Sequence, residues 1–290
     1  MLSIYALEKI LAHLSVFRPV LESGVHRYSA AMNYPQRIIC LTEETTETLY
    51  AIGAEDRIVG ISGFTVRPER ARKEKPKVSA FTSAKIGRIL ELKPDLVLGF
   101  SDMQADIAAE LVRNGVAVHI FNQRTVAGIL SMIRTLGGML GLSAKTDAYA
   151  HELSARVERV RLKQMRKNRP RVYFEEWGDP MITGIGWVSE LVGIAGGEDI
   201  FPEKAAEPGA RERIIQNPEE VVNRKPDIII GSWCGRKFRP DQVAGRPGWD
   251  AIPAVVNNHL YEIKSPLILQ PGPAALTDGL DALCEIIDRV

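Results

Sequence analysis

The chain has 290 residues, of which 45% are hydrophobic and 25% charged, and its formal net charge is +1. This composition is typical of a soluble globular protein long enough for two domains, and the charge gives no reason to expect nucleic acid or an anionic membrane surface as a partner. No apolar run approaches the roughly 18 residues of a membrane span, and the three scattered cysteines (Cys40, Cys234, Cys284) predict neither a disulfide framework nor a CxxC metal site.

Residues 1–36 are predicted to be a non-secretory N-terminal extension. Apolar residues recur there at roughly helical spacing, but Glu8, Lys9, His13 and Arg18 stand among them. An export signal needs an unbroken apolar stretch of about 7 to 15 residues. We therefore expect a cytoplasmic protein that starts at Met1 or at Met32, with a periplasmic location as the alternative. The unpaired cysteines are consistent with a reducing compartment.

From residue 37 onward, short apolar runs alternate with helical stretches, a pattern that predicts an α/β fold with parallel sheets and right-handed crossovers. The first run leads into a helix that Thr42 or Thr45 could cap, with Glu43 and Glu44 in the first turn, where the helix dipole favours acidic residues. These elements form a first Rossmann-like lobe, residues 37–124. We expect its strands over 38–41, 58–61, 96–99 and 116–121, and helices over 84–92 and 103–114.

Residues 125–168 are predicted to be a helical linker. The segment is rich in Ala, Leu, Glu, Arg and Lys, has no Pro, and has its last Gly at Gly141. Ser143 is a suitable N-cap, so we expect one long helix over 143–167. Two lobes joined by such a helix should move little against each other.

A second α/β lobe, residues 169–290, is predicted because the chain repeats itself. The break at Lys93-Pro94-Asp95, followed by a buried run that ends in Gly, returns as Lys225-Pro226-Asp227. Arg37 and Arg171 open corresponding strands, and Gly53-Ala-Glu-Asp is echoed by Gly196-Gly-Glu-Asp. An ordered set of repeats is much less expected by chance than one isolated turn.

Ligands of open parallel sheets bind beyond the carboxyl ends of the strands, and in a two-lobed chain those ends can face one cleft. The residues that follow the predicted strands are Glu43-Glu44, Phe64, Phe100, Glu175-Glu176-Trp177 and Trp233. Aromatic rings there suit a large, flat, partly apolar ligand, although they could instead pack the interfaces of the lobes.

Several motifs in this chain resemble the helical-backbone (class III) substrate-binding proteins of ABC importers for vitamin B12, haem and iron siderophores. The similarity is greatest to the vitamin B12-binding (cobalamin) branch and covers about residues 37–290. The motifs are Arg37-Ile-Ile-Cys-Leu-Thr-Glu-Glu-Thr-Thr-Glu-Thr-Leu-Tyr-Ala-Ile-Gly53, Arg57-Ile-Val-Gly-Ile-Ser62, Lys77-Val-Ser-Ala-Phe81, Leu92-Lys-Pro-Asp-Leu-Val-Leu98 and Ala195-Gly-Gly-Glu-Asp-Ile200.

This resemblance implies two lobes around a ligand cleft and an ABC permease as partner. It places Phe64, Phe81 and Trp177 at aromatic cleft positions, where they would flank a corrin rather than ligate cobalt. It also makes Glu219 the carboxylate with which the second lobe docks on the permease. Two positions depart from the family pattern: Gly87 stands where the first lobe should carry its docking carboxylate, and Gln270 stands where relatives often have Arg.

We therefore expect a non-enzymatic binding protein for a corrinoid, with no catalytic residues, no catalytic cofactor and no resident metal. The expected ligand-binding residues are Phe64, Phe81, Phe100, Glu175, Glu176, Trp177, Trp233 and Gln270. One alternative is a cytoplasmic binding or sensing protein for another metal chelate, of the haem or siderophore type.

A second alternative is a small-molecule enzyme that uses Glu43-Glu44 and Glu175-Glu176 as opposed carboxylate pairs, which could also bind a metal or a cationic ligand. The simpler interpretation of Glu43 and Glu44 is a preference for a helix N-terminus. His119 and His259 have no partner at metal-ligand spacing, and the GxSxG, GxxxxGK[ST] and GxGxxG motifs do not occur.

Overall fold

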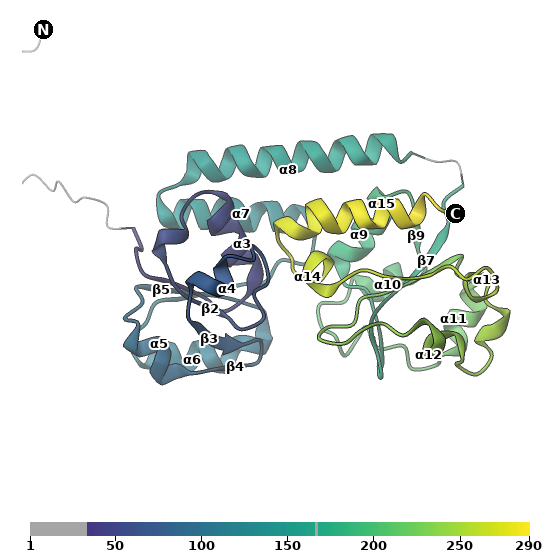
Figure 1. The fold of residues 1–290 in the computed structure, drawn as a ribbon, viewed down its shortest axis with the longest axis horizontal. Coiled ribbons are helices and arrows are strands. Elements are labelled where there is room, and N and C mark those ends of the chain that lie inside the picture. Colours follow the sequence, from purple (N-terminus) through teal and green to yellow (C-terminus); the bar gives the residue numbers. More distant parts are fainter. Residues whose placement is uncertain (1–33, 166–167) are drawn as a thin grey trace, which may run out of the picture. The chain divides into compact units, whose positions relative to one another are not determined.

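The computed structural model describes residues 34–165 and 168–290, and residues 35–290 form one compact unit. The predicted extension, residues 1–36, lies almost entirely outside the described residues. Two separate sheets, with helices packed around them, make up the unit (Figure 1). The predicted fold class, α/β with parallel sheets in two halves, is confirmed. Within the described ranges, no helix is both long enough and apolar enough to span a membrane.

The first sheet has the strand order β4-β3-β2-β1-β5-β6 and is parallel except for the β3–β4 pair. Its central strands are apolar on both faces because helices cover both, as the predicted buried runs require. We call this sheet with its helices the first lobe. Its elements are β1 (Ile38–Cys40), α3 (Glu43–Ala51), β2 (Ile58–Ser62), α4 (Ala71–Glu74), β3 (Lys77–Ala80), β4 (Ser83–Ala84), α5 (Ile86–Glu91), β5 (Leu96–Phe100), α6 (Ala105–Arg113) and β6 (Val118–Phe121).

The second sheet has the order β11-β10-β7-β8, and β9 pairs with β7 beside this path. Strand β10 is parallel to both β7 and β11, whereas β8 turns back antiparallel to β7. We call this sheet with its helices the second lobe. Its elements are β7 (Arg171–Gly178), β8 (Met181–Thr183), α9 (Gly186–Ile194), β9 (Glu198–Asp199), α10 (Pro202–Ala205), α11 (Glu219–Arg224), β10 (Ile228–Gly231), α12 (Pro240–Ala244), α13 (Pro253–Val256) and β11 (Leu260–Glu262).

The two Lys-Pro-Asp repeats have the same structure. Lys93 and Lys225 both end a helix in the left-handed region, with φ of 48° and 45°. In each lobe the following aspartate accepts a hydrogen bond from the backbone N–H that opens the first strand: Asp95 from Arg37 at 2.9 Å and Asp227 from Arg171 at 2.8 Å. The internal repeat therefore specifies one helix-to-strand connection that is built twice.

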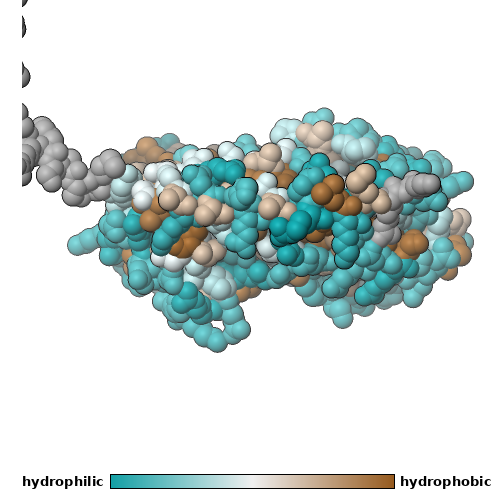
Figure 2. Space-filling model, turned by 90° about the horizontal axis from the view of Figure 1, so that it is seen from above, coloured by the Kyte–Doolittle hydropathy of each residue, from teal (hydrophilic) through white to brown (hydrophobic). Residues whose placement is uncertain are grey.

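Two helices connect the lobes, α7 (Val126–Leu140) and α8 (Ser143–Lys163). Thr125 caps α7, since its hydroxyl accepts a hydrogen bond from the Gly128 N–H at 2.9 Å. The long helix begins at the predicted residue, but Ser143 is its first helical residue and not its cap, and it ends at Lys163 instead of residue 167. Seen from the α8 side, the surface is mostly hydrophilic with scattered hydrophobic residues, which agrees with the many charged residues of this helix (Figure 2).

A single hydrophobic core passes from one lobe to the other. It includes Ile38 and Leu98 of the first sheet and Val172 and Ile230 of the second. The C-terminal elements α14 (Ser265–Ile268), η4 (Ala275–Gly279) and α15 (Leu280–Ile287) supply further core residues, and η4 packs against α8. Because packed cores resist shear, the lobes are held together by this core as well as by the long helix.

Candidate ligand-binding site

The carboxyl-end edges of the two sheets lie close together. Cys234 follows β10 of the second lobe, and its pKa is raised first by burial, then by Glu43 of the first lobe and by Glu176 of the second. On the other side, Arg124 follows β6 of the first lobe, and its carbonyl oxygen lies so near Gly186 of the second lobe that a Cβ atom there would be only 2.4 Å from it. The residues after the parallel strands of both lobes therefore meet at one place, which we call the inter-lobe site.

Glu43 and Glu44 of the first lobe are buried and have no cationic partner among the described residues. Helix α3 begins at Glu43, as the acidic first turn indicated, and Glu43 and Glu44 are 7% and 0% exposed. Thr42, expected as a cap, instead donates its hydroxyl to Glu44 Oε1 at 2.5 Å, while Glu44 Oε2 has no hydrogen-bond partner among the described residues. Burial raises the pKa of Glu43 to about 7 and that of Glu44 to about 8, in spite of the helix dipole.

The carboxylates of the second lobe are instead fully paired. Arg246 forms a bidentate ion pair with Glu175, with Nη–Oε distances of 2.5 and 3.0 Å, and Tyr173 and Trp233 donate to the same carboxylate at 2.9 and 3.0 Å. The neighbouring Glu176 is paired with Arg213, which also donates to the Thr183 carbonyl at 2.5 Å.

Glu175 is 0% exposed, so it cannot contact a ligand directly, which corrects its expected role. Glu176 keeps partial exposure, but its charge is offset by Arg213. Neither carboxylate is free to serve as an acid or a base in the way that the enzyme hypothesis requires.

The expected aromatic residues differ in how much surface they offer. Phe64, directly after β2, is 53% exposed, and Phe81 after β3 is partly buried against the core. Trp177 is half-buried, donates its indole N–H to the Asp179 carbonyl at 2.7 Å, and carries Arg236 over its ring. The structure thus leaves Phe64, Phe81 and Trp177 with accessible ring surface.

The other two aromatic residues are tied to protein neighbours. Phe100 is only 7% exposed and packs edge-on against Trp187, so it is a core residue that offers little surface to a ligand. Trp233 is half-buried, with its N–H on Glu175 and its ring edge-on to Phe238 at 5.3 Å between centroids. The alternative interpretation of the aromatic residues, that they pack the protein interior instead of contacting a ligand, therefore applies to Phe100 and in part to Trp233.

The expected docking residue Glu219 and the two positions that depart from the family pattern, Gly87 and Gln270, lie on exposed or half-exposed surface. Gln270 is half-buried in the turn after α14, where its backbone carbonyl accepts a hydrogen bond from the Gly272 N–H at 2.8 Å. Glu219 is exposed as the first residue of α11. Gly87 is exposed in α5, between Lys85 and Arg88. The two lobes thus present different charges at corresponding helices.

Sequence reasoning missed the arginines of the inter-lobe site, Arg124, Arg213 and Arg246. Arg213 is 2% exposed, although it stands in a run of charged residues that reads as solvated surface. The best available signal was the position of Arg124, three residues after the predicted β6 strand. The partners of Arg213 and Arg246 are distant in the chain, so local patterns could not reveal them.

The described residues contain no group of three or more His, Cys, Asp or Glu side chains placed to hold a metal ion. His119 packs edge-on against Phe121, and burial lowers its pKa. His259 lies with Nδ1 at 3.2 Å from the Asp227 carbonyl oxygen. Both histidines are thus engaged with neighbouring residues of their own lobe.

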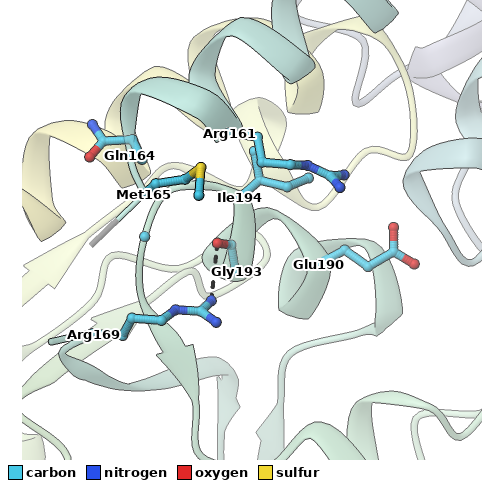
Figure 3. A pocket seen from close by; sticks show the side chains of 8 residues that line it. Arg161, Gln164, Met165, Arg169, Glu190, Gly193 and Ile194 are labelled. Carbon is cyan, nitrogen blue, oxygen red and sulfur yellow. Dashed lines mark hydrogen bonds between the residues drawn. The ribbon is translucent and has the colours of Figure 1, made fainter. Parts of the chain in front are cut away.

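Two cavities lie away from the strand ends. The larger, of about 700 Å³, lies between the end of α8 and α9, where Arg161, Met165 and Glu190 line it and Arg169 donates to the Gly193 carbonyl (Figure 3). The other, of about 530 Å³, lies beside α3 and the 66–70 loop. Neither contains any of the predicted ligand-binding residues.

The fold and the site permit comparison with known proteins. A profile described as "Periplasmic binding protein" matches residues 38–267. The chain belongs to this family. It is 28% identical over 258 residues to a vitamin B12-binding protein of Vibrio campbellii, covering 88% of this chain and 90% of the relative.

Solved structures of binding proteins share this fold. The periplasmic vitamin B12-binding protein of Vibrio cholerae superposes with a TM-score of 0.71 at 23% identity, over 88% of this chain and 97% of that one. The structure of IsdE from S. aureus complexed with haem superposes with a TM-score of 0.73 at 21% identity, over 87% of this chain and 98% of IsdE. These two proteins are named for different ligands, so the shared fold does not select between corrinoid and haem. The relatives give no support to the expected cytoplasmic location, since the V. cholerae protein is named as periplasmic.

Proposed function

We propose that this protein binds a corrinoid, or a closely similar metal chelate, at the inter-lobe site without chemical turnover. The observation that carries the proposal is the meeting of the two strand-end edges, where a Cβ atom at Gly186 of the second lobe would lie only 2.4 Å from the carbonyl oxygen of Arg124 in the first lobe. Phe64 and Trp177 add accessible aromatic surface at these edges. Flat rings on two opposed edges suit a planar macrocycle.

A corrinoid is the first candidate because the Vibrio campbellii relative, named for vitamin B12, matches most of both chains. Haem or a ferric siderophore is the second candidate, favoured by the fold shared with the haem complex of IsdE. A calorimetric screen of cobalamin, cobinamide, haem and ferric siderophores tests the proposal. Absence of binding to all four would refute it.

The aromatic contacts give a sharper test of where the ligand lies. Replacing Trp177 or Phe81 by Ala should weaken binding by about 1 to 3 kcal/mol, the order expected when a buried aromatic contact is lost. A bound corrin should also quench tryptophan fluorescence. Leu162→Ala is the control, because Leu162 is 61% exposed on α8. Unchanged affinity in both site variants would place the ligand elsewhere.

Delivery to an ABC importer is the second part of the proposal. Glu219, exposed at the start of α11, would dock on basic residues of the permease. At the corresponding helix of the first lobe, Gly87 stands between two basic residues, so the contact of this lobe with the permease must differ from that of the second lobe. Glu219→Lys should abolish ligand-stimulated ATPase activity of a reconstituted importer and leave ligand affinity unchanged.

The same role requires the protein to lie outside the cytoplasm, where it could meet an importer from the outer side. The V. cholerae relative, which is named as a periplasmic protein, supports a periplasmic location. Fractionation of the native, untagged protein followed by intact mass measurement tests this. Recovery in the cytoplasm with an intact N-terminus would favour a binding or sensing role without transport.

A further inference from the structure

The end of helix α8 carries a concentration of positive charge that the net charge of the chain conceals. Residues 156–171 contain eight basic side chains and one acidic side chain, whereas the whole chain has a net charge of only +1. Helix α8 ends within this run, at Lys163. A local cluster of this kind creates a field that attracts anions, whatever the net charge. We call the following exposed residues the α8-end patch: Arg159, Arg161, Leu162, Lys163, Met165 and Arg169.

Most of the positive charge in the α8-end patch is not paired. Arg159 and Lys163 form no ion pair with any of the described residues. Arg161 Nε lies 3.4 Å from Glu158 Oε2, but both side chains are more than half exposed, so the pair is weak in water. Arg169 donates to the Gly193 carbonyl at 3.1 Å and not to a carboxylate.

Two further carboxylates lie beside the patch, and both are engaged by protein groups. Glu190 accepts the Val126 N–H at 2.8 Å, at the N-terminus of α7, where the helix dipole offsets part of its charge. Asp288 accepts a hydrogen bond from Gln164 Nε2 at 3.2 Å. Because the run itself holds eight basic side chains, positive charge remains in excess over these carboxylates.

Two large apolar side chains stand among the basic ones. Leu162 is 61% exposed and Met165 is 76% exposed. Arg159 and Lys163 share the outer face of α8 with Leu162, since residues three and four apart are neighbours on a helix, whereas Leu153 on the opposite face is buried. A surface that combines basic and exposed apolar residues is typical of segments that lie on anionic lipid.

The cavity of about 700 Å³ between the end of α8 and α9 adjoins this patch. Arg161 and Met165 lie on its α8 side, Arg169 lies across from them, and the Glu190 carboxylate points away from Arg169 (Figure 3). Guanidinium groups suit the oxygens of a phosphate. The headgroup of a phospholipid therefore fits between Arg161 and Arg169.

We propose that the α8-end patch binds the surface of an anionic phospholipid membrane. Arg161 and Arg169 meet headgroup phosphates, and Leu162 and Met165 enter the interfacial layer. The binding is peripheral, since no helix in the described ranges spans a membrane. The patch lies on the opposite side of the molecule from α5 and α11, the helices expected to meet a permease, so the inference does not depend on the proposed function (Figure 1).

Vesicle flotation of the full chain tests the proposal. Wild type should bind vesicles of phosphatidylglycerol and phosphatidylcholine in equal parts, more weakly as the salt concentration rises, and should not bind phosphatidylcholine alone. Arg159→Gln/Lys163→Gln should weaken binding to the anionic vesicles by about 25-fold, because each basic side chain near such a surface contributes about fivefold. Arg161→Gln alone should weaken it by about fivefold.

The matched control is Lys77→Gln/Lys85→Gln, which removes the same charge from exposed residues of the first lobe. It should change vesicle binding by less than about twofold, because the removed charges lie far from the patch. Equal melting temperatures of the variants and wild type show that each variant is folded. Equal losses in the control and in Arg159→Gln/Lys163→Gln, or equal binding of wild type to neutral and anionic vesicles, would overturn the proposal.

The apolar residues distinguish a lipid surface from a soluble polyanion. Leu162→Ser/Met165→Ser should weaken vesicle binding by about 10-fold at unchanged net charge, and should leave binding of polyglutamate unchanged. If this variant binds vesicles as wild type does, and polyglutamate competes with the vesicles, the patch is a site for an acidic protein and the lipid proposal fails. A ligand screen without a positive result leaves the vesicle result standing and refutes only the proposed function.

Discussion

The two acidic pairs at the strand ends, Glu43-Glu44 and Glu175-Glu176, occupy corresponding places in the two repeats but differ in their electrostatics. In the first lobe both side chains are buried with no cationic partner in the part of the chain that the structure describes, and burial raises their pKa values to about 7 and about 8. In the second lobe Arg246 and Arg213 pair with the two carboxylates. The first lobe therefore has carboxyl groups whose pKa values lie near neutral pH, whereas the second has neutralised ion pairs.

This difference shows that the two repeats share their backbone structure more closely than they share the charge pairing of the carboxylates at the strand-end edge. Both lobes share the left-handed lysine and the aspartate contact that begin each central strand. The arginines that pair with the carboxylates come from loops of the second lobe, and no described arginine of the first lobe pairs with Glu43 or Glu44. Buried carboxylates without cations can donate hydrogen bonds when protonated, whereas paired ones only hold the fold.

The largest effect is expected from removing a cation of the second lobe. Arg246→Met leaves Glu175, which is 0% exposed, as an unpaired buried charge, so it should lower the free energy of unfolding by about 3 to 5 kcal/mol. Urea denaturation measures the change. Arg134→Met, whose ion pair is exposed, is the matched control and should cost less than about 1 kcal/mol. Equal losses in the two variants would mean that the Glu175 pair has no special structural role.

The first lobe should respond to pH through its buried carboxyl group, Glu44. The pKa of Glu44 in the folded protein is about 8, above the 4.5 that is usual for a glutamate, so the unfolded state releases its proton first as the pH rises. The contribution of Glu44 to the free energy of unfolding is therefore fully present below about pH 4.5. It is lost progressively as the pH rises to about 8, by at most about 1.4 kcal/mol per pH unit.

Glu44→Gln removes this titration. The variant should exceed wild type in stability by up to about 3 kcal/mol at pH 7 and match it more closely near pH 5. Denaturant midpoints from pH 5 to 8 give the comparison, with Glu91→Gln, an exposed α5 residue, as control. Parallel pH profiles for wild type and Glu44→Gln would show that Glu44 is ionised in the folded protein.

A smaller effect should follow from removing one donor of Glu175. Trp233→Phe loses the indole N–H at 3.0 Å but keeps Arg246 and Tyr173 on the carboxylate, so we expect a loss of about 1 to 2 kcal/mol. Thermal unfolding of the variant provides the measurement. A loss as large as that of Arg246→Met would indicate that packing of the ring on Phe238, not the hydrogen bond, stabilises this corner.

The sequence by itself determined the α/β class, the two similar halves and the central strands, because these depend on local features. Apolar runs closed by Gly and the Lys-Pro-Asp break act within a few residues, and the structure places strands at all four predicted runs of the first lobe, with bounds that differ by one or two residues. Helix ends were less well determined. The cap expected at Ser143 and the end expected at residue 167 were wrong, since end positions depend on which groups tertiary packing leaves for the terminal amides and carbonyls.

Only the tertiary structure decided which strand-end residues are free to meet a ligand. Phe64 and Phe100 look alike in the sequence, each following a buried strand, yet one is 53% exposed and the other 7%. Glu43 and Glu175 likewise look equivalent, but Arg246 reaches only Glu175, from 71 residues further along the chain. Charge, pKa and exposure at these positions are set by contacts between distant segments, and no local pattern of residues records those contacts.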